Sequence, residues 1–552
     1  MFSSAGAYLW TSAFVIRKSS VTGGGPIVVT GFTNLTGGTS GAGPYAPMGV
    51  DNDNACATEG YFIGTDNAVY GLLQVRRVST PGGTPTLSGN LSLTVPNTYF
   101  PNTQPAQGST TNLDGNDDRL IKAALHTNKI TGATTLWTVH GFRMTTACAR
   151  TTTGSRNGER WYEITGSAPT AAAPLGGNMT LVQSGSLCDP ATTNTKGYIY
   201  GSVIETGQGH MVLAATIAAS NLYAGIVAAG RLRTDTLGAT QATTTVQNGL
   251  NSYTRVANGR NRWGDYSFTD VDPNDDMTVW TFQEYADATA NQWAVRAAQL
   301  KAPPPPPSTA NPATVPQGAT ATTVVCSRTS GTLEFFDPGV ESCGGPGWAN
   351  HISATATNNV TVNSITFDSV SQVTLDLNTT ASTPNTASVI TIMNPDGQTA
   401  ACNLTVGNPL AAVLADFSAA PNGNAIRVTW ETVSEVGNIG FNLWRGDSPS
   451  APDTQLNSAL IPSQAPGSSQ GFIYTFDDAN VVSGMTYYYW LETVDTQGGV
   501  SRFGPVSAAF TAPTAVRVLD AGAAASLPLA LPLAGAGLLA LAGLALAGRR
   551  RG

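Results

Sequence analysis

Apolar and polar residues alternate in short runs along most of the chain. Residues 426–430, 439–445 and 486–493 are clear examples, and alternation with a period of two is typical of strands that bury one face. Glycine, proline, asparagine and aspartate separate such runs, as expected for turns. The pattern therefore predicts an all-β fold, with a helix only in the apolar C-terminal tail.

Two segments near the start of the chain repeat each other with an offset of 59 residues. Residues 14–26 align with residues 73–85, so that Arg17 corresponds to Arg76. Each copy has an alternating strand followed by a turn of glycine and proline. A repeat of roughly 40–60 residues with several short strands is expected for a propeller, whose blades bury their faces only against neighbouring blades.

Aspartate turns stand directly before several predicted strands in the same region. Examples are residues 66–70, 117–120 and 275–280, while Trp161 and Trp293 lie in later strands. Together with the repeat they predict a partial β-propeller of roughly four to five blades over residues 1–300. No export signal precedes the first strand, so we expect the sequence to be truncated at its N-terminus and to begin inside a longer chain.

Three segments, 261–267, 271–276 and 280–285, together resemble the closing blade of sialidase-like propellers in secreted bacterial proteins. That resemblance implies glycoside hydrolysis, in which three arginines hold a carboxylate, a glutamate activates a tyrosine nucleophile and an aspartate is the acid/base. Residues of the right types are Arg17, Arg76, Arg77, Arg119, Glu59, Tyr61, Asp66 and Glu163. Because Arg17 and Arg76 hold equivalent positions, a structural role is favoured for both, and no catalytic or ligand-binding residue is assigned.

The composition changes after residue 300. A lysine, an alanine and five prolines predict an extended linker over residues 301–319. Residues 320–408 then show short β runs, and the turn at 394–398 with the strand before it resembles the last hairpin of IPT/TIG-type immunoglobulin-like domains. A first β-sandwich is therefore expected over 320–408.

A second β-sandwich is expected over residues 411–513, which resemble a fibronectin type III domain. Trp430 ends an alternating strand and would be the core tryptophan. Residues 486–493 supply a later strand, in which Tyr487 would be the corner tyrosine. Such domains are most often spacers or binding modules.

An apolar stretch at 527–548 is followed by three arginines. It is about long enough to cross a hydrocarbon core of roughly 30 Å as a helix, so residues 526–552 are predicted to be a transmembrane or sorting tail behind a spacer at 514–525. The tail resembles the C-terminal sorting signals of exosortase-type systems in Gram-negative bacteria. The residues that carry this interpretation are Leu527, Pro528, Pro532, Arg549, Arg550 and Arg551.

Charged residues make up 11% of the chain, and the formal net charge is -8. This argues against a nucleic-acid-binding protein, which needs clustered lysine and arginine. The six cysteines have no CxxC spacing, so a zinc or dithiol site is not predicted. Export permits disulfides: Cys326, Cys343 and Cys402 could supply one bridge within a small domain, whereas the three N-terminal cysteines are either bridged or free and buried.

Two loops rich in oxygen ligands are candidate calcium sites. The first contains Asp270, Asp272, Asn274, Asp275 and Asp276, and the second contains Asp51, Asn52, Asp53 and Asn54. Turns stabilised by Asp and Asn side chains give the same pattern. A Ser-His-Asp hydrolase would need one of the histidines His126, His140, His210 and His351, but no Gly-x-Ser-x-Gly motif occurs and a structural role is favoured for His140 and His210.

These features together predict an exported protein at the surface of, or outside, a Gram-negative-type bacterium. A propeller head on a stalk of two sandwiches would bind a carbohydrate or a protein. Two further functions stay open, an extracellular sialidase-like glycoside hydrolase and a structural component of the cell envelope. The expected partners are a surface ligand and, through the tail, a membrane with its sorting machinery; nucleic acid is not expected.

Overall fold

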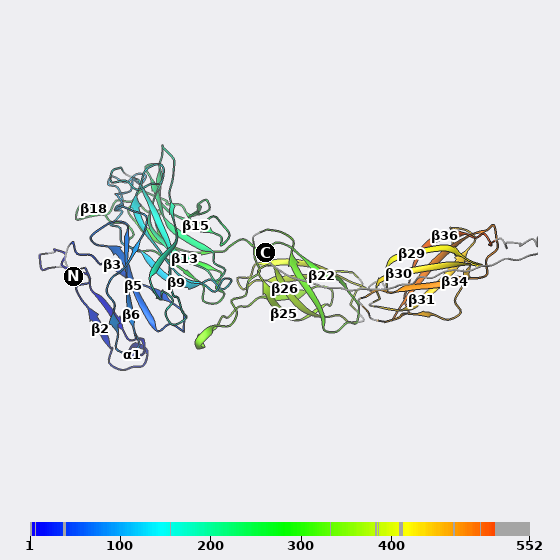
Figure 1. The fold of residues 1–552 in the computed structure, drawn as a ribbon. Coiled ribbons are helices and arrows are strands. Elements are labelled where there is room, and N and C mark those ends of the chain that lie inside the picture. Colours follow the sequence, from blue (N-terminus) through cyan, green and yellow to red (C-terminus); the bar gives the residue numbers. More distant parts are fainter. Residues whose placement is uncertain are drawn as a thin grey trace, which may run out of the picture. The chain divides into compact units, whose positions relative to one another are not determined.

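The computed structural model describes residues 3–513, except residues 6, 37–39, 155, 332, 381–382, 385, 408–411, 436, 467, 469 and 497. The chain divides into two compact units, Met1–Pro409 and Leu410–Gly552. Figure 1 shows that strands dominate both units. Within the described residues, helical turns are limited to α1 (Lys18–Thr22) and η1 (Ser342–Gly344), so the predicted all-β class is confirmed.

Four sheets follow one another along residues 44–300, and their strands are antiparallel except for one short parallel pair in the second sheet. The first contains β3 (Pro44–Gly49), β5 (Glu59–Asp66), β6 (Leu72–Ser79), β7 (Thr86–Leu87) and β8 (Leu91–Thr94). The second contains β4 (Asp51–Asn52), β9 (Lys122–Thr127), β10 (Thr134–Arg143), β11 (Asn157–Gly166) and β12 (Met179–Leu187). The third contains β13 (Gly197–Glu205), β14 (Met211–Ala219), β15 (Leu222–Arg231) and β16 (Thr244–Gln247), and the fourth β19 (Phe268–Val271), β20 (Val279–Ala286) and β21 (Trp293–Leu300). A small ribbon of β17 (Val256–Ala257) and β18 (Arg260–Asn261) lies between the last two sheets in sequence.

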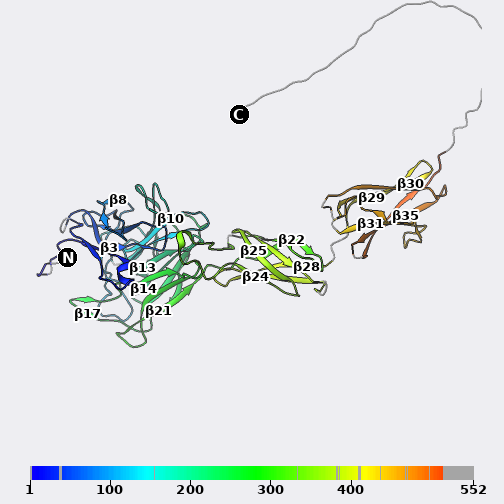
Figure 2. The ribbon, with the colours of Figure 1, turned by 90° about the horizontal axis from the view of Figure 1, so that it is seen from below.

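Consecutive sheets lie against each other in the first unit (Figure 2), and apolar side chains fill the space between them. Ile63 of the first sheet shares a core with Leu136 of the second. Between the second and third sheets, Trp137 stacks on Trp161 with ring centroids 5.8 Å apart, and both share a core with Leu213. Each such fully buried side chain contributes about 1.5–3 kcal/mol relative to an exposed one. The facing sides of neighbouring sheets are therefore buried against each other, whereas the outer face of the fourth sheet is exposed at Phe282 and Trp293.

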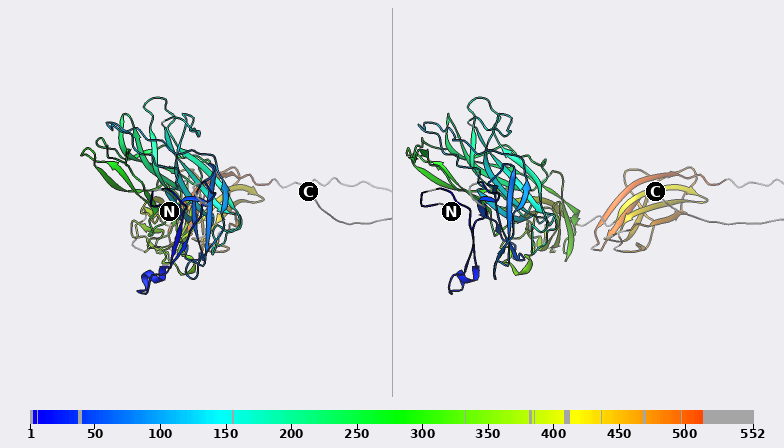
Figure 3. Two further views of the ribbon diagram at one scale, coloured as in Figure 1. Left: turned by 90° about the vertical axis from the view of Figure 1, so that its left-hand side faces the viewer. Right: turned by 60° about the vertical axis from the view of Figure 1, so that its left-hand side comes forward.

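A hairpin of β1 (Ala13–Ile16) and β2 (Val29–Phe32) precedes the first sheet, with α1 in its connection (Figure 3). The repeated arginines link this hairpin to the first sheet. The guanidinium of Arg17 donates to the carbonyl of Gly83 (2.6 Å), and that of Arg76 donates to the carbonyl of Leu35 (2.9 Å). Arg17 thus holds backbone of the other copy, and Arg76 holds backbone just after β2, so both arginines have the structural contacts favoured from the repeat.

The predicted immunoglobulin-like region is one seven-stranded sheet in the order β24-β27-β28-β22-β23-β26-β25. Its strands are β22 (Ser308–Val315), β23 (Thr322–Arg328), β24 (Ser353–Ala356), β25 (Thr361–Ser369), β26 (Gln372–Asn378), β27 (Ala387–Met393) and β28 (Thr399–Val406). The end strands β24 and β25 contact each other, so the sheet curls around one apolar core. The linker predicted over 301–319 is too long, because β22 already begins at Ser308.

Three disulfides pair all six cysteines. Cys326 and Cys402 form the bridge expected within the small domain, in its core. Cys148 and Cys188 join the loop after β10 to the end of β12. Cys56 and Cys343 are 287 residues apart and join the head to the immunoglobulin-like region. The alternative of free thiols in the N-terminal half is therefore wrong.

The second unit is a sandwich of the sheets β29-β30-β34 and β32-β31-β35-β36, with β33 beside β31. Its strands are β29 (Val413–Asn422), β30 (Ala425–Ser434), β31 (Asn438–Gly446), β32 (Thr454–Gln455), β33 (Ile461–Pro462), β34 (Ile473–Asp478), β35 (Thr486–Asp495) and β36 (Val500–Ala509). Trp430 is fully buried and stacks on Tyr474, with ring centroids 5.3 Å apart. The hydroxyl of Tyr487 accepts a hydrogen bond from the N–H of Val482 (3.0 Å). Both predicted marker residues of this sandwich are confirmed.

The predicted spacer and tail, residues 514–552, lie outside the described residues. Of the helices within the described part of the chain, none has the length and apolar character to cross a membrane. The transmembrane helix, the sorting signal and the truncated N-terminus stay predictions.

Candidate ligand-binding site

Three of the predicted sialidase-type residues come together at one end of the first sheet. The hydroxyl of Tyr61 donates to the carboxylate of Glu59 (3.1 Å), and the guanidinium of Arg77 lies 3.9 Å from the same carboxylate. Arg77 also donates to the backbone carbonyls of Leu175 and Gly177. Tyr61 is only 3% exposed, and burial raises its pKa to about 12. Because the tyrosine is sealed and stays protonated, this trio joins the first sheet to the second rather than forming a catalytic site.

Other members of the predicted set have structural partners elsewhere. Arg17 and Arg76 hold carbonyl groups between the repeated segments, and Glu163 accepts a hydrogen bond from Gln183 (2.6 Å). Asp66 accepts two N–H groups of the turn before β6 (2.9 Å each), as its position in the sequence predicts. The eight residues therefore do not form one site.

The two predicted calcium loops meet around a lysine. The Nζ atom of Lys122 lies 2.6 Å from the carboxylate of Asp51 and 3.3 Å from that of Asp270. It also lies 4.0 Å from the ring centroid of Phe268. The Lys122 side chain is 4% exposed, so a buried ammonium of the protein itself compensates both loops.

The remaining carboxylates of the first loop have separate partners. Asp272 accepts from the side chain of Asn274 (2.9 Å), and Asp275 accepts the backbone N–H groups at positions 277 and 278 (2.9 and 2.7 Å). Asp276 lies 2.7 Å from Nε2 of His126; burial alone would lower the pKa of His126, but Asp276 outweighs burial and raises it. In the second loop, Asn52 and Asn54 accept backbone N–H groups of their own turn (3.1 and 2.9 Å). No group of three or more His, Cys, Asp and Glu side chains in the described part of the chain is placed to hold a metal ion, and calcium stays a prediction.

His140 and His210 have the structural role favoured from the sequence. Burial lowers the pKa of His140 to about 4, so its neutral ring donates to the carbonyl of Asp118 (2.9 Å) through Nδ1 and accepts from the hydroxyl of Tyr162 (3.0 Å) through Nε2. Burial also lowers the pKa of His210 to about 4, and its Nδ1 accepts a backbone N–H (3.0 Å). His351 lies at an exposed position beside a carboxylate (3.2 Å).

A pocket of about 440 Å³ lies where segments of the first two sheets converge. The segments are the N-terminal end of β3, the turn at 66–71 between β5 and β6, and the loop at 95–121 between β8 and β9. We call it the loop-end pocket. It is lined by Tyr8, Tyr45, Asp66, Asn67, Ala68, Val69, Tyr70, Phe100, Asp117 and Asp118.

Two adjacent carboxylates of the loop-end pocket have opposite electrostatic environments. Arg119 donates two side-chain hydrogen bonds to Asp117 (2.7 Å each), and the hydroxyl of Tyr45 donates a third (2.9 Å). Burial alone would raise the pKa of Asp117, but Arg119 outweighs burial and holds the pKa below its ordinary value. Burial, and then the charge of Asp117, raise the pKa of Asp118 to about 6. The pocket thus combines a permanently ionised carboxylate with one that takes up a proton in mildly acidic solution.

Aromatic rings provide the apolar part of the lining. Tyr70, Tyr99 and Phe100 form a cluster with ring centroids 5.0–5.5 Å apart, a spacing typical of favourable tilted contacts. The side chain of Phe100 is 41% exposed, although it is large and apolar. The rings of Tyr45 and Tyr8 meet edge to face at 6.2 Å.

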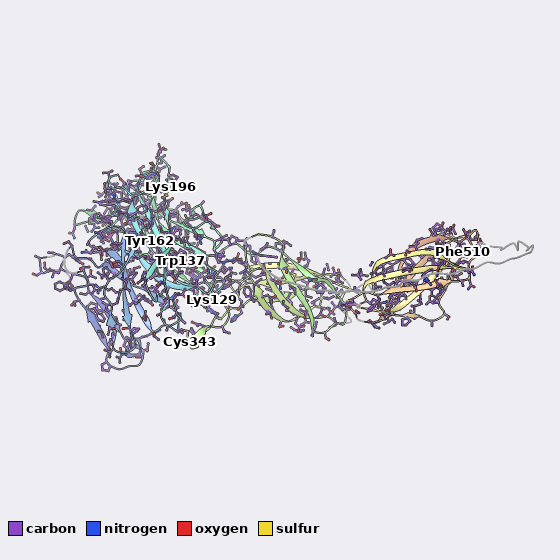
Figure 4. All side chains as sticks on the ribbon, viewed as in Figure 1. Lys129, Trp137, Tyr162, Lys196, Cys343 and Phe510 are labelled. Carbon is purple, nitrogen blue, oxygen red and sulfur yellow. A yellow bond between two sulfur atoms is a disulfide. The ribbon has the colours of Figure 1, made fainter. Side chains whose placement is uncertain are left out.

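Two other hollows differ in chemistry. One of about 400 Å³ lies between head loops and the immunoglobulin-like region; there Lys129 lies 5.3 Å from the ring centroid of Trp348, and Figure 4 shows Lys129 near Cys343. The other, of about 530 Å³, lies beside the fourth sheet, where Phe282 and Trp293 are 44% and 56% exposed. The hollow beside the fourth sheet also combines aromatic rings with two carboxylates, Asp265 and Glu284. Of these three hollows, only the loop-end pocket is lined by the carboxylates of two consecutive residues, Asp117 and Asp118.

The sequence pattern marks only part of the loop-end pocket. Asp117 and Asp118 stand out as turn residues, and Arg119 as a residue of sialidase type, whereas nothing in the local pattern marks Tyr45 or Phe100. The usable signal is the run of two aspartates and an arginine directly before the buried strand β9, because adjacent carboxylates seldom enter a buried region without a functional or structural reason.

No protein-family model matches the chain, and no curated protein matches it. One similar solved structure is SGBP-B of the Bacteroides ovatus mixed-linkage glucan utilization locus, in complex with a mixed-linkage heptasaccharide: 12% identity, 42% of this chain, 52% of that chain, TM-score 0.21. Another is the adhesin InvE of Yersinia pseudotuberculosis: 13% identity, 36% of this chain, 57% of that chain, TM-score 0.14. The matches thus span little more than half of those chains, and at these TM-scores they do not define the fold or function of this protein.

Proposed function

We propose that this chain is an extracellular or cell-surface binding protein whose head holds a carbohydrate chain in the loop-end pocket. The observation that carries the proposal is the convergence of Tyr45, Tyr70 and Phe100 with the carboxylates of Asp117 and Asp118. The two sandwiches that follow in the chain serve as its stalk.

The chemistry of a sugar matches this lining. The C–H faces of a pyranose ring are apolar and stack on exposed rings such as Phe100, while its hydroxyls donate hydrogen bonds to carboxylates. Asp117 stays ionised through Arg119 and so remains an acceptor. A concave site with several apolar surfaces and a few fixed polar groups is the usual form of a ligand pocket.

Disulfides support an exported location. All six cysteines are paired, and such bridges persist in oxidising compartments rather than in the cytosol. The apolar tail with Arg549, Arg550 and Arg551 would then be a sorting or membrane signal at the envelope of a Gram-negative-type bacterium. Cell fractionation tests this part: recovery of the native protein in the cytosol would contradict it.

The four stacked sheets are proposed to be an arc of a β-propeller. Apart from β4, which joins the second sheet from within the first, the strands of each sheet follow in chain order and the sheet packs on the next, as blades do. The apolar outer face of the fourth sheet, with Phe282 and Trp293, would then be a blade-packing surface and not the carbohydrate site.

A glycan array with the purified full-length protein tests the binding function. Replacing Phe100 by alanine should weaken binding of any captured glycan at least tenfold, because the stacking surface is lost. The matched control is Phe282→Ala, which removes a similarly exposed ring from the fourth sheet. If the control loses binding and Phe100→Ala does not, the site is wrong. If no glycan binds, the envelope component or a protein ligand becomes the better interpretation.

A glycoside hydrolase is the second candidate function, and the paired aspartates favour it. Two neighbouring carboxyls with separated pKa values are the arrangement from which a base and an acid can be drawn. In this case Asp118, with a pKa of about 6, would be the acid and Asp117 the ionised partner. Incubation of captured glycans with the protein, followed by mass spectrometry, tests it: turnover that Asp118→Asn abolishes would replace the binding function, and intact glycans after long incubation would exclude hydrolysis of those glycans.

A further inference from the structure

We propose that the ligand is an acidic polysaccharide, bearing uronate or sulfate groups, and that it runs from the loop-end pocket onto a neighbouring cationic rim. The inference rests on the proposed carbohydrate function and names its substrate class. The cationic rim consists of Arg143, Arg150, Arg156 and Lys196, on or beside the two loops at one end of the second sheet.

The cationic rim stands out because its charges lack carboxylate partners. None of the four side chains forms an ion pair with a carboxylate of the described residues, although the chain has 35 acidic against 27 basic residues. Arg143 and Arg150 donate to backbone carbonyls at positions 152 and 98 (2.9 and 3.2 Å). Arg156 donates to the hydroxyl of Thr195 (2.7 Å) and to two backbone carbonyls. These contacts fix the guanidinium groups without neutralising them.

A hollow of about 480 Å³ opens between these loops. Its polar side chains are Arg156, Lys196, the amide of Gln104 and six hydroxyl groups, and no carboxylate contributes to the lining. The hydroxyls belong to Thr145, Thr146, Thr151, Thr153, Thr195 and Ser220. Asp189, an acid in the loop before Lys196, instead accepts the backbone N–H groups of Ala191 (3.0 Å) and Lys196 (2.8 Å). Cations and hydroxyl donors without a built-in anion suit a ligand that brings its own negative charge.

The hollow is held in shape by covalent and backbone constraints. The disulfide between Cys148 and Cys188 joins the two loops that border it. Gly197 forms part of its lining, and a Cβ atom there would lie 1.7 Å from the side chain of Gln104, which is itself held by the carbonyl of Ala218 (3.0 Å). Lys196, labelled in Figure 4, precedes this glycine. A rigid, preorganised lining reduces the entropy lost when a ligand binds.

Tyr99 connects the cationic rim to the loop-end pocket. The guanidinium carbons of Arg143 and Arg150 lie 5.6 and 5.5 Å from its ring centroid. Tyr99 also packs against Tyr70 and Phe100, which line the loop-end pocket. Aromatic and cationic groups therefore continue from the loop-end pocket to Arg143 and Arg150, which lie at either end of the segment 144–149 beside the second hollow. A polysaccharide can stack sugar rings on the aromatic part while its acidic groups reach the arginines and the lysine.

Binding to alginate and to chondroitin sulfate, compared with neutral dextran, tests the proposal on the full-length protein by titration calorimetry. Replacing Arg150 and Lys196 together by glutamine should weaken binding of an acidic polymer at least tenfold. The slope of log K against the logarithm of the salt concentration should also become less steep by about 1.5. Each lost contact between a cationic side chain and a polyanion reduces this slope by about 0.7–0.9. The matched control replaces Lys18 and Arg296, two exposed cations of the head, by glutamine and should leave both quantities unchanged.

The outcomes separate this inference from the proposed function. Equal binding of dextran and the acidic polymers, unaffected by the double substitution, overturns the acidic class while the carbohydrate function stands. Equal loss in the control variant overturns the cationic rim, because net charge alone would then explain binding. Binding of double-stranded DNA as tight as that of alginate also overturns it, because the cationic rim would then bind any polyanion and would not select a polysaccharide. If no polysaccharide binds, both the carbohydrate function and the acidic class are wrong. The glycan array shows whether the protein binds a neutral glycan instead.

Discussion

Glu159 in β11 should make the head lose stability as the pH rises. The residue is 0% exposed, and no described side chain donates to either of its oxygens. Its carboxyl faces the backbone of Gly201 in β13, where a Cβ atom would lie 2.7 Å from Oε2. Burial raises the pKa of Glu159 from an ordinary 4.5 to about 8. The folded protein therefore keeps this proton over a pH range in which the unfolded chain releases it.

The sign and size of the effect follow from linkage. When folding raises the pKa of a carboxyl, its contribution to the free energy of unfolding is greatest below the pKa of the unfolded chain. That contribution is lost as the pH rises to the pKa of the folded state. With 1.36 kcal/mol for each pH unit in that window, the loss between about pH 5 and about pH 8 is about 3–4 kcal/mol as an upper bound. Glu159→Gln keeps the volume of the side chain and removes the titrating group. Over the same pH range, the free energy of unfolding of this variant should therefore fall by about 3–4 kcal/mol less than that of the parent chain.

Differential scanning calorimetry of both proteins between about pH 5 and about pH 8 measures this difference. At about 2–4 °C for each kcal/mol in a domain of 150–250 residues, the melting temperature of the head should fall by roughly 10 °C more in the parent chain than in Glu159→Gln. The control is Glu431→Gln, an exposed glutamate of the second unit. Parallel pH profiles of parent and Glu159→Gln would refute the reasoning, because Glu159 would then be ionised or hydrated in the folded head.

Three further changes test other parts of the fold. Replacing Cys56 and Cys343 by serine should lower the melting temperature of the first unit. Closing a loop of 287 residues stabilises the folded state by about 5–6 kcal/mol if everything between the cysteines unfolds in one step. An unchanged calorimetric transition would show that the bridge does not constrain the unfolded chain. Lys122→Met should lower the free energy of unfolding by about 1–3 kcal/mol, because two aspartates lose their cation. Urea denaturation measures this change. An unchanged free energy of unfolding would mean that the two loops bind another cation. Tyr487→Phe should cost the second unit about 1 kcal/mol, and a stability equal to the parent's would deny the corner hydrogen bond.

Features determined by neighbouring residues were predictable from the sequence. Asp66 and Asp275 accept N–H groups of the turns that they begin, because a short carboxylate reaches only two or three residues ahead. Trp430 and Tyr487 mark their sandwich because alternation places them on its inner face. Arg17 could be assigned a structural role because its counterpart repeats its position.

The linker prediction failed for a local reason. Residues 308–315 lack alternating apolar residues, and Pro312 argues against a central strand. In the structure, β22 pairs with β23 only up to Asn311 and with β28 on both sides of a register shift between Thr309 and Thr314. The proline therefore lies in the break of both ladders, and a strand can include it without losing a hydrogen bond.

The loop-end pocket and the longest disulfide depend on packing between sheets, which a local pattern does not contain. Tyr45 begins the first sheet and Asp117 precedes the second; their side chains meet because the sheets pack face to face. Cys56 pairs with Cys343 across 287 residues. Proximity in sequence would favour Cys326 with Cys343, 17 residues apart, whereas the structure pairs Cys326 with Cys402.

The bridge between Cys56 and Cys343 would have a mechanical consequence for the proposed surface protein, held at one end and bound to its ligand at the other. The head is joined to the region beginning at β22 by two covalent routes, the short proline segment and this disulfide. A pulling force is shared between them, so the contacts enclosed by this loop resist shear that would peel apart a single tether. Chemical reduction should therefore convert a junction that fails only by bond rupture into one that opens at low load.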